Sequence, residues 1–353
     1  MILWVLLSAA YLFIAPAAHA DSIPKHVLTA DYLGRASDTV LPASQLSQFL
    51  DWAETSWQYN PQAVAAGIKV MYYIDPNRLN DTNPLYSTDE RVYAHDCNGN
   101  RLRSLYYHNM FLTDPSSVIL QQNFQRLIAS RSANRHWDAF FVDDAFTTEG
   151  LSGLPCGFDP DKWLEAEKQL IASVHVPIVY NGLEIDKTRQ LNVISNVIGG
   201  MEEGCYSGSV KFPKMWGHYW TQIENTELAM ARDKKLFFCY GRDTTSASDA
   251  IDGRLFTYAS FLLTYTPGSS ILWEYYATPS KFRVEPETGL VAMDPVVSSP
   301  LDVSALQQQT GVYGREYRSC YLRGEAVGPC AAIVNSSRST WLNYPFGDRY
   351  KHT

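Results

Sequence analysis

Acidic side chains end several of the short apolar runs in this sequence. The clearest case is Trp137–Phe146, WDAFFVDDAF, in which Asp143 and Asp144 follow an uninterrupted apolar segment. A strand can be buried on both faces and still emerge at its C-terminal end into a cleft, where the scaffold holds polar side chains in place. Carboxylates in such positions are suited to acid/base chemistry.

Polar and aromatic side chains stand at the ends of other apolar runs as well. Glu202 and Glu203 follow VIGGM. The other candidate binding residues at run ends are Asp31, Tyr32, Asp75, Tyr180, Asn181, Arg242, Trp273 and Glu274. Two carboxylates facing each other across a cleft are the groups that cleave glycosidic bonds, since one protonates the leaving oxygen while the other attacks the anomeric carbon or activates water.

Strand geometry favours one acid of each pair. Side chains alternate between the two faces of a strand, so Asp143 continues the row of Phe141 while Asp144 turns to the rim. We therefore predict Asp143 as nucleophile or base. Glycines around Glu202 and Glu203 blur the alternation there, and we favour Glu203 as proton donor, with Glu202 left as the alternative.

Composition and missing motifs exclude several other functions. The sequence has no Gly-x-Ser-x-Gly elbow, His-Glu-x-x-His zinc site or phosphate-binding Gly-x-x-x-x-Gly-Lys loop. We predict no cofactor and no metal site. A net charge of -8 argues against nucleic acid as a partner, while aromatic residues at 13%, with 22 Tyr and 9 Trp, suit sugar rings.

Apolar strand patterns alternate with helical patterns for about 250 residues, which predicts parallel pairing and an α/β fold, a (β/α)8 TIM barrel. An open doubly wound sheet is the alternative, but no Gly-rich phosphate loop follows an early strand. Predicted strands are His26–Tyr32, Ile68–Ile74, Leu105–Leu112, Ala139–Asp143, Pro177–Asn181, Val197–Glu203, Leu236–Tyr240 and Ser270–Trp273. Predicted helices cover Ala43–Tyr59, a segment opened by Asp114 and Pro115, one opened by Asp159 and Pro160, Trp216–Lys234 and Ser246–Tyr265.

The two ends of the chain differ from this pattern. Residues 1–20 read as a signal peptide cleaved after Ala20, which predicts a secreted or periplasmic protein with no membrane contact after removal of the signal. Residues 21–300 form the predicted catalytic barrel. Residues 301–353 contain apolar and aromatic residues typical of β-strands, with turns and no helical periodicity, which predicts a small C-terminal β appendage packed on the barrel.

Six cysteines in an exported chain allow up to three disulfides. Cys320 and Cys330 flank a short Gly-containing stretch and are the favoured local pair. Cys97 and Cys156 lie in predicted loops and could join them. Cys239 lies inside an apolar run and is predicted as a buried thiol.

The strand order, with FFVDD on the fourth strand, GGMEEGC on the sixth and the late stretch through Tyr313, Arg315, Tyr317 and Asn335, resembles the glycoside hydrolase-like TIM barrels related to glycoside hydrolase family 114, the endo-α-1,4-polygalactosaminidases. The resemblance implies Asp143 and Glu203 or Glu202 as the catalytic pair. It implies a polysaccharide or oligosaccharide substrate, such as an amino-sugar polymer.

Two other functions remain open at this stage. The barrel could bind carbohydrate without catalysis, or the paired acids could serve a metal-assisted hydrolase. Retention or inversion depends on the separation of the two carboxyl groups, on which the sequence is silent. The sugar, its linkage, endo or exo action and the oligomeric state are likewise left open.

Overall fold

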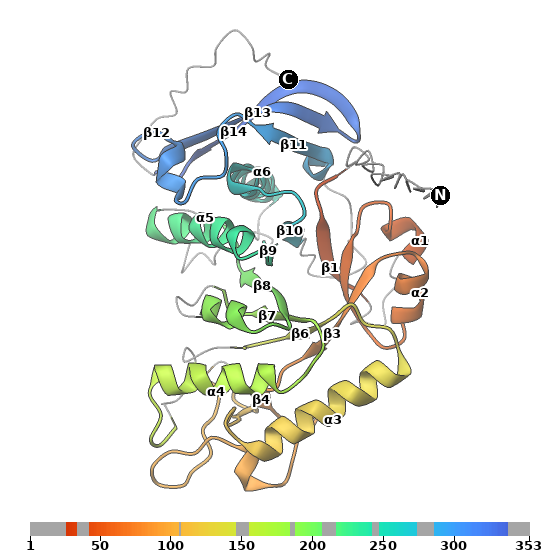
Figure 1. Ribbon diagram of the computed structural model, residues 1–353, viewed down its shortest axis with the longest axis vertical. Helices are drawn as coiled ribbons and strands as arrows, with labels where there is room; N and C mark the ends of the chain where they lie inside the picture. Colours follow the sequence, from red (N-terminus) through yellow and green to blue (C-terminus); the bar gives the residue numbers. More distant parts are fainter. Residues whose placement is uncertain are drawn as a thin grey trace, which may run out of the picture.

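The computed structural model describes residues 26–33, 42–105, 107–145, 155–183, 188–206, 217–241, 247–273 and 286–337. Within them, parallel strands close into a barrel in the order β1-β10-β9-β8-β7-β6-β3-β2. Their bounds are β1 (Thr29–Leu33), β2 (Trp52–Thr55), β3 (Lys69–Ile74), β6 (Ala139–Val142), β7 (Ile178–Asn181), β8 (Val197–Glu203), β9 (Leu236–Tyr240) and β10 (Ser270–Trp273). The helices surround this barrel (Figure 1). The predicted (β/α)8 barrel is confirmed.

The second barrel strand lies where a helix was predicted. Residues of the segment Ala43–Tyr59 form a short helix α1 (Ala43–Leu46) and then β2, and helix α2 (Asn60–Ala65) follows. The prediction of one helix is wrong because all four residues of β2 are buried, so the strand shows no alternation that would distinguish it from an apolar helix face.

The predicted strand Leu105–Leu112 is not part of the barrel. Only Phe111–Leu112 (β5) is extended, and it pairs antiparallel with Arg78–Leu79 (β4) in a separate two-stranded sheet. Strand β3 pairs directly with β6. The segment between β3 and β6 therefore begins with a long loop, which leaves the C-terminal end of β3 and carries this small sheet.

Four long helices pack around the strands: α3 (Val118–Asn134), α4 (Pro160–Ala172), α5 (Gly217–Arg232) and α6 (Ala247–Thr264). Asp159 caps α4 as predicted, since its carboxylate accepts from the Lys162 amide at 2.8 Å. Helix α3 is capped by Ser117 rather than Asp114, whose carboxylate accepts from the Ser116 amide. Short 3-10 turns are η1 (Glu90–Val92), η2 (Thr188–Val193), η4 (Pro286–Gly289) and η5 (Val303–Leu306).

The barrel interior is filled by side chains. Phe141, Phe238 and Trp273 meet there, with ring centroids of Phe141 and Phe238 lying 5.5 and 5.7 Å from that of Trp273. The interior cluster also contains Ala30, Trp52, Met71, Ala139, Val179, Met201, Tyr240 and Ile271. These residues define the inward row of each strand, and so they identify which side chains reach the mouth of the barrel.

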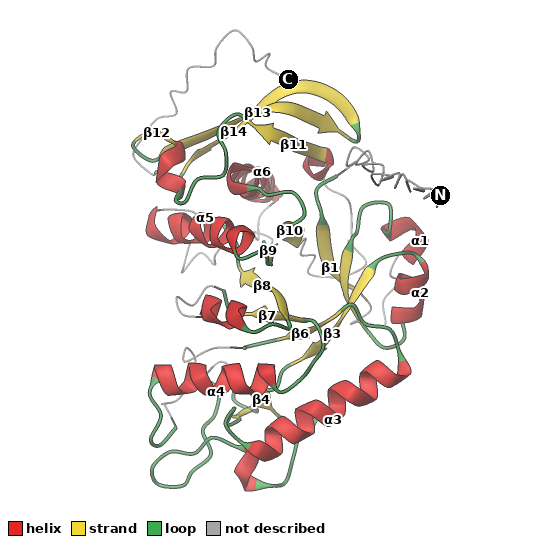
Figure 2. Cartoon of the chain, in the orientation of Figure 1, coloured by secondary structure: helices red, strands yellow, loops and turns green. Residues whose placement is uncertain are grey.

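An antiparallel sheet follows the barrel, as predicted. It contains β11 (Leu290–Pro295), β12 (Gln307–Gln309), β13 (Val312–Leu322) and β14 (Glu325–Asn335), and it covers α6 (Figures 1 and 2). Arg315 of β13 is buried and donates to the carbonyl oxygens of Leu263 and Tyr265 at 3.1 and 3.4 Å. These bonds join the sheet to the C-terminal end of α6.

Three disulfides link all six cysteines: Cys97–Cys156, Cys205–Cys239 and Cys320–Cys330. The first and third were predicted. The prediction of a buried thiol at Cys239 is wrong, because Cys239 on β9 faces Cys205, which follows the neighbouring strand β8.

Two buried acids share one hydroxyl between α5 and α6. The Thr264 hydroxyl lies 2.7 Å from a Glu224 oxygen and 2.9 Å from a Glu227 oxygen, and both glutamates are fully buried. Burial raises the pKa of Glu227 to about 8 and the pKa of Glu224 well above its ordinary value, the latter also because Glu227 is close by. A hydroxyl donates one proton, so Thr264 can satisfy only one of the two carboxylates, while the Ser270 hydroxyl donates to Glu227 as well.

Candidate active site

Asp143 and Glu203 meet at the side-chain amide of Asn181. The Asn181 Nδ2 atom donates to Asp143 Oδ1 at 2.8 Å and to Glu203 Oε2 at 3.0 Å. Because both oxygens accept from one nitrogen, they lie no more than about 6 Å apart, close to the separation of a retaining pair. The ends of β6, β7 and β8 therefore converge on one pair of acids.

Asp143 is oriented by three donors. Besides Asn181, the Tyr73 hydroxyl donates to Asp143 Oδ2 at 2.6 Å, and the Asp144 amide donates to Oδ1 at 3.0 Å. Tyr73 lies on the inward row of β3, two residues after Met71 of the interior cluster. The carboxyl group of Asp143 is thus fixed at the barrel mouth by groups from β3, β7 and its own backbone.

The neighbouring acid Asp144 turns away from this pair. Its φ of 49° places it in the left-handed region, and its carboxylate forms an ion pair of 2.8 Å with Arg78. Burial, followed by the charge of Asp143, raises the pKa of Asp144 to about 7, although Arg78 opposes the shift. The carboxyl of Asp144 also lies close to that of Asp75. Asp144 is a half-buried member of the rim.

Asp75 forms the turn after β3. Its Oδ1 accepts from the amides of Asn77 and Arg78, both at 2.9 Å. Burial and then the charges of Asp144 and Asp143 raise the pKa of Asp75 well above its ordinary value. Asp75 thus holds the loop that carries Arg78, and its carboxyl lies close to those of Asp144 and Asp143.

A second layer behind the site includes Glu167 of α4. The Asn77 side-chain amide donates to the Asp144 carbonyl at 2.8 Å and to Glu167 Oε1 at 3.0 Å. Glu167 is fully buried, and burial raises its pKa to about 8. The backbone of the Asp143–Asp144 turn is therefore fixed from the helix side.

Aromatic residues line the opposite side of the barrel mouth. The Tyr32 ring lies 4.8 Å from the Trp273 ring and 5.8 Å from the Tyr240 ring. Trp273 is only 1% exposed, so its face is covered by these neighbours. Tyr32, which is half-buried, presents the accessible aromatic surface of this group.

Three of the predicted site residues lie on the outer face of their strands. Asp31 alternates with Ala30 and Tyr32 of the interior row and accepts from the Tyr32 amide at 2.6 Å. Glu202 is paired in register with Cys239, which belongs to the outer core. These two acids are therefore directed away from the pair at Asn181.

Tyr180 is the third outward residue. Its ring covers Gly200, where a Cβ atom would lie 2.7 Å from Tyr180 Cζ, and its hydroxyl donates to Asn192 at 3.0 Å. Tyr180 is fully buried, so it offers no free face to a sugar. The other two predicted binding residues, Arg242 and Glu274, lie outside the described residues.

Several residues at the mouth were not found from the sequence. Tyr73, Asn77 and Arg78 contact the acids as described above. Tyr107 lies near the acids, because its pKa is raised first by burial and then by the negative charges of Asp144, Glu203 and Asp143. Glu54, at the end of β2, is buried. Inward alternation on β3 could have identified Tyr73, whereas Tyr107 lies in a loop whose path no pattern predicts.

The Cys205–Cys239 disulfide joins the ends of β8 and β9 two residues beyond Glu203. We expect the double variant Cys205→Ser/Cys239→Ser to lose about 3 to 4 kcal/mol of unfolding free energy, because the bond closes a loop between residues 34 apart. Denaturant titration measures this loss. The matched control is Cys320→Ser/Cys330→Ser, whose bond spans only 10 residues and lies in the C-terminal sheet; an equal loss in both variants would contradict the loop-length argument.

Two further searches concern the described residues only. No group of three or more His, Cys, Asp and Glu side chains in them is arranged to hold a metal ion. None of the helices described combines the length and apolar character needed to cross a bilayer.

No protein-family model matches the sequence, and no curated protein matches it. Solved structures do resemble it. The noncanonic maltogenic α-amylase AmyB from Thermotoga neapolitana has a TM-score of 0.50 at 10% identity, over 85% of this chain and 86% of the amylase. The glycoside hydrolase domain of PelA from Pseudomonas aeruginosa has a TM-score of 0.46 at 12% identity, over 69% and 98%. Ega3 from Aspergillus fumigatus, solved in complex with galactosamine, has a TM-score of 0.41 at 11% identity, over 73% and 96%. At these identities the likeness is one of fold: the chain has the barrel found in glycoside hydrolases.

Proposed function

We propose that this protein is a secreted glycoside hydrolase that cleaves a polysaccharide by paired-carboxylate catalysis. The observation that carries the proposal is the placement of Asp143 and Glu203 on one amide of Asn181 at the C-terminal mouth of the barrel. The three disulfides support export. Cleavage of a signal peptide after Ala20 is part of the same proposal.

We assign different roles to the two acids. Asp143, held by three donors, attacks the anomeric carbon, and the C–O bond to the leaving sugar breaks as Glu203 gives its proton to that oxygen. Glu203, then a carboxylate, takes a proton from water, and the resulting hydroxide displaces Asp143 from the sugar. Glu203 rather than Glu202 fills this role because Glu203 shares Asn181 with Asp143.

The charge of the site suggests a class of sugar for the catalytic centre. Asp75, Asp143, Asp144 and Glu203 gather there, while Arg78 already forms an ion pair with Asp144. A site with this excess of carboxyl groups suits a neutral or amino sugar. An amino-sugar polymer, as in relatives of glycoside hydrolase family 114, is the finer form of the proposal.

The product is expected to keep the anomeric configuration of the substrate. Two acids bound to one nitrogen leave no room between them for a sugar and an attacking water, which inverting enzymes need. Proton NMR during the first minutes of hydrolysis, on substrates found by screening neutral and amino-sugar polysaccharides, identifies the first anomer released. Initial release of the opposite anomer would contradict the nucleophile role of Asp143, and absence of new reducing ends on every glycan would contradict the proposed function.

A further inference from the structure

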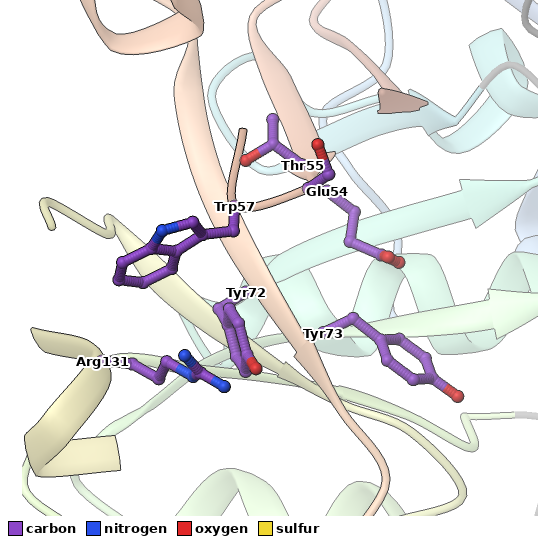
Figure 3. Close-up of a pocket in the computed structure, with 7 residues that line it drawn as sticks. Glu54, Thr55, Trp57, Tyr72, Tyr73 and Arg131 are labelled. Carbon is purple, nitrogen blue, oxygen red and sulfur yellow. The ribbon is translucent and has the colours of Figure 1, made fainter. Parts of the chain in front are cut away.

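A cavity of about 260 Å³ opens beside the catalytic pair, at the C-terminal ends of β2 and β3. It is lined by Glu54, Thr55, Trp57, Tyr72, Tyr73 and Arg131. In Figure 3, Glu54 and Tyr73 extend to one side and Trp57, Tyr72 and Arg131 to the other. Tyr73 lines the cavity and its hydroxyl donates to Asp143, so this one side chain lies between the cavity and the catalytic centre.

Arg131 of α3 brings a positive charge into this cavity. Its guanidinium carbon lies 5.2 Å from the ring centroids of both Trp57 and Tyr72. A second guanidinium, that of Arg135, lies 4.4 Å from the Trp57 centroid. Nε of each arginine is buried without a hydrogen-bond partner, and no carboxylate in the described part of the chain forms an ion pair with either. The aromatic rings position the Arg131 guanidinium through cation–π contacts, which do not use its N–H donors.

Thr55 provides a second, independent observation. Its side chain lines the cavity and is only 5% exposed, yet its hydroxyl has no hydrogen-bond partner. A buried hydroxyl without a partner is costly, and native proteins rarely keep one unless something else satisfies it. A ligand in the cavity would do so.

We propose that this cavity is a sugar subsite for a unit that carries an anionic group, either a carboxylate or a sulfate ester. The inference rests on the proposed function and adds a substrate class to it. The planar donors of Arg131 match such groups, and Trp57 offers a ring for stacking. The volume lies below the range of roughly 300 to 1,000 Å³ that holds drug-sized ligands, so one sugar unit fits.

The opposite charges on the two sides of the cavity determine the order in which the sugar units of the substrate bind. Glu54 lies on the side of Tyr73, whose hydroxyl donates to Asp143, while Arg131 lies on the opposite side (Figure 3). The substrate is therefore a chain in which a neutral or amino sugar occupies the catalytic centre and an acidic unit lies next to it. A polymer without acidic units would leave Arg131 unmatched.

The test compares charged polymers with neutral counterparts: a uronate polysaccharide with its carboxyl-reduced form, and a sulfated one with its desulfated form. We expect the wild-type protein to prefer one charged polymer, and Arg131→Gln to raise KM for it about tenfold or more, with kcat and the neutral counterpart little changed. The matched control is Arg126→Gln on the same helix, which is exposed. Equal kinetics for Arg131→Gln and wild type on both pairs would overturn the subsite.

The Thr55→Val variant distinguishes loss of a ligand contact from a packing defect caused by Arg131→Gln. It removes the hydroxyl with little change of volume, so a subsite predicts a higher KM with no loss of thermal stability. Binding of the same polymers to the Asp143→Asn variant is measured by calorimetry. Absence of hydrolysis by the wild-type protein counts against the proposed function, whereas binding without preference for charge counts against the subsite.

Discussion

Asp143→Asn is expected to lower the rate of glycan hydrolysis by roughly four orders of magnitude, because the amide can neither attack the anomeric carbon nor leave as a carboxylate. The variant keeps the size of the side chain, and Tyr73 and Asn181 still lie around it. Binding of the glycan should therefore persist. Initial rates of reducing-end release, measured beside the binding affinity, check both parts of this expectation.

The matched control is Asp81→Asn, an exposed aspartate in the loop after β4. It should hydrolyse at the wild-type rate. If Asp143→Asn retains more than a tenth of that rate, Asp143 is not the nucleophile. Absence of turnover in the wild-type protein and in both variants, with glycan binding intact in all three, would instead favour a carbohydrate-binding protein whose acids have no catalytic role.

A smaller side chain at the same position gives a positive readout. In Asp143→Gly the cavity left by the carboxylate can admit azide, which attacks the anomeric carbon from the same face when the leaving group is a good one. A glycosyl azide of inverted configuration is the expected product. Its appearance cannot arise from an unfolded variant, so it separates loss of the nucleophile from loss of the fold.

Glu227→Gln is expected to make the protein more stable than wild type above pH 8. The folded protein holds a proton on Glu227 up to a pKa of about 8, whereas the ordinary value is 4.5. The folded state therefore binds more protons between these values, and the free energy of unfolding falls as pH rises through them, by an amount on the order of several kcal/mol. Glutamine stays neutral, so this loss disappears in the variant.

Thermal unfolding followed by circular dichroism between pH 5 and pH 9 measures the effect. The wild-type Tm should decline over this range, and the decline should be shallower in Glu227→Gln. Glu167 and Asp144, whose pKa values are raised to about 8 and about 7, leave part of the slope in place. Glu165→Gln, an exposed residue of α4, is the control. Parallel Tm curves for Glu227→Gln and wild type would show that the buried acids do not titrate as proposed.

The barrel could be predicted from the sequence because most of its strands are separate apolar runs bounded by helices. Strand β2 was predicted as part of a helix for a physical reason. Trp52–Thr55 is short and buried on both faces, so its residues fit the apolar spacing of the helices on either side. The predicted strand near Leu105, which is not a barrel strand, took the place of β2 among the eight predicted strands. Asp143 and Glu203 thus kept their places on the fourth and sixth strands although one of the counted strands was misplaced.

The candidate site was predictable only where alternation along a strand carried the information. Asp143 follows Phe141 on the inward row, and the structure has the same parity. At β8 the register shifts between Val197 and Gly199, which is why Glu202 and Glu203 could not be separated from the sequence. The shared amide of Asn181 depends on the closure of the barrel, because it joins three strands, and no local pattern encodes it.

Arg315 has a practical consequence for anyone who wishes to produce the barrel alone. Its guanidinium, from β13, donates to the carbonyls of Leu263 and Tyr265 at the end of α6, and the Tyr317 hydroxyl donates to the carbonyl of Leu262, the residue before Leu263. A gene shortened to end at residue 300 would remove the donors to those oxygens and expose to water the apolar side of α6 that β13 and β14 cover. Expression of the barrel alone is thus a poor route to this protein, and fusion partners belong after β14.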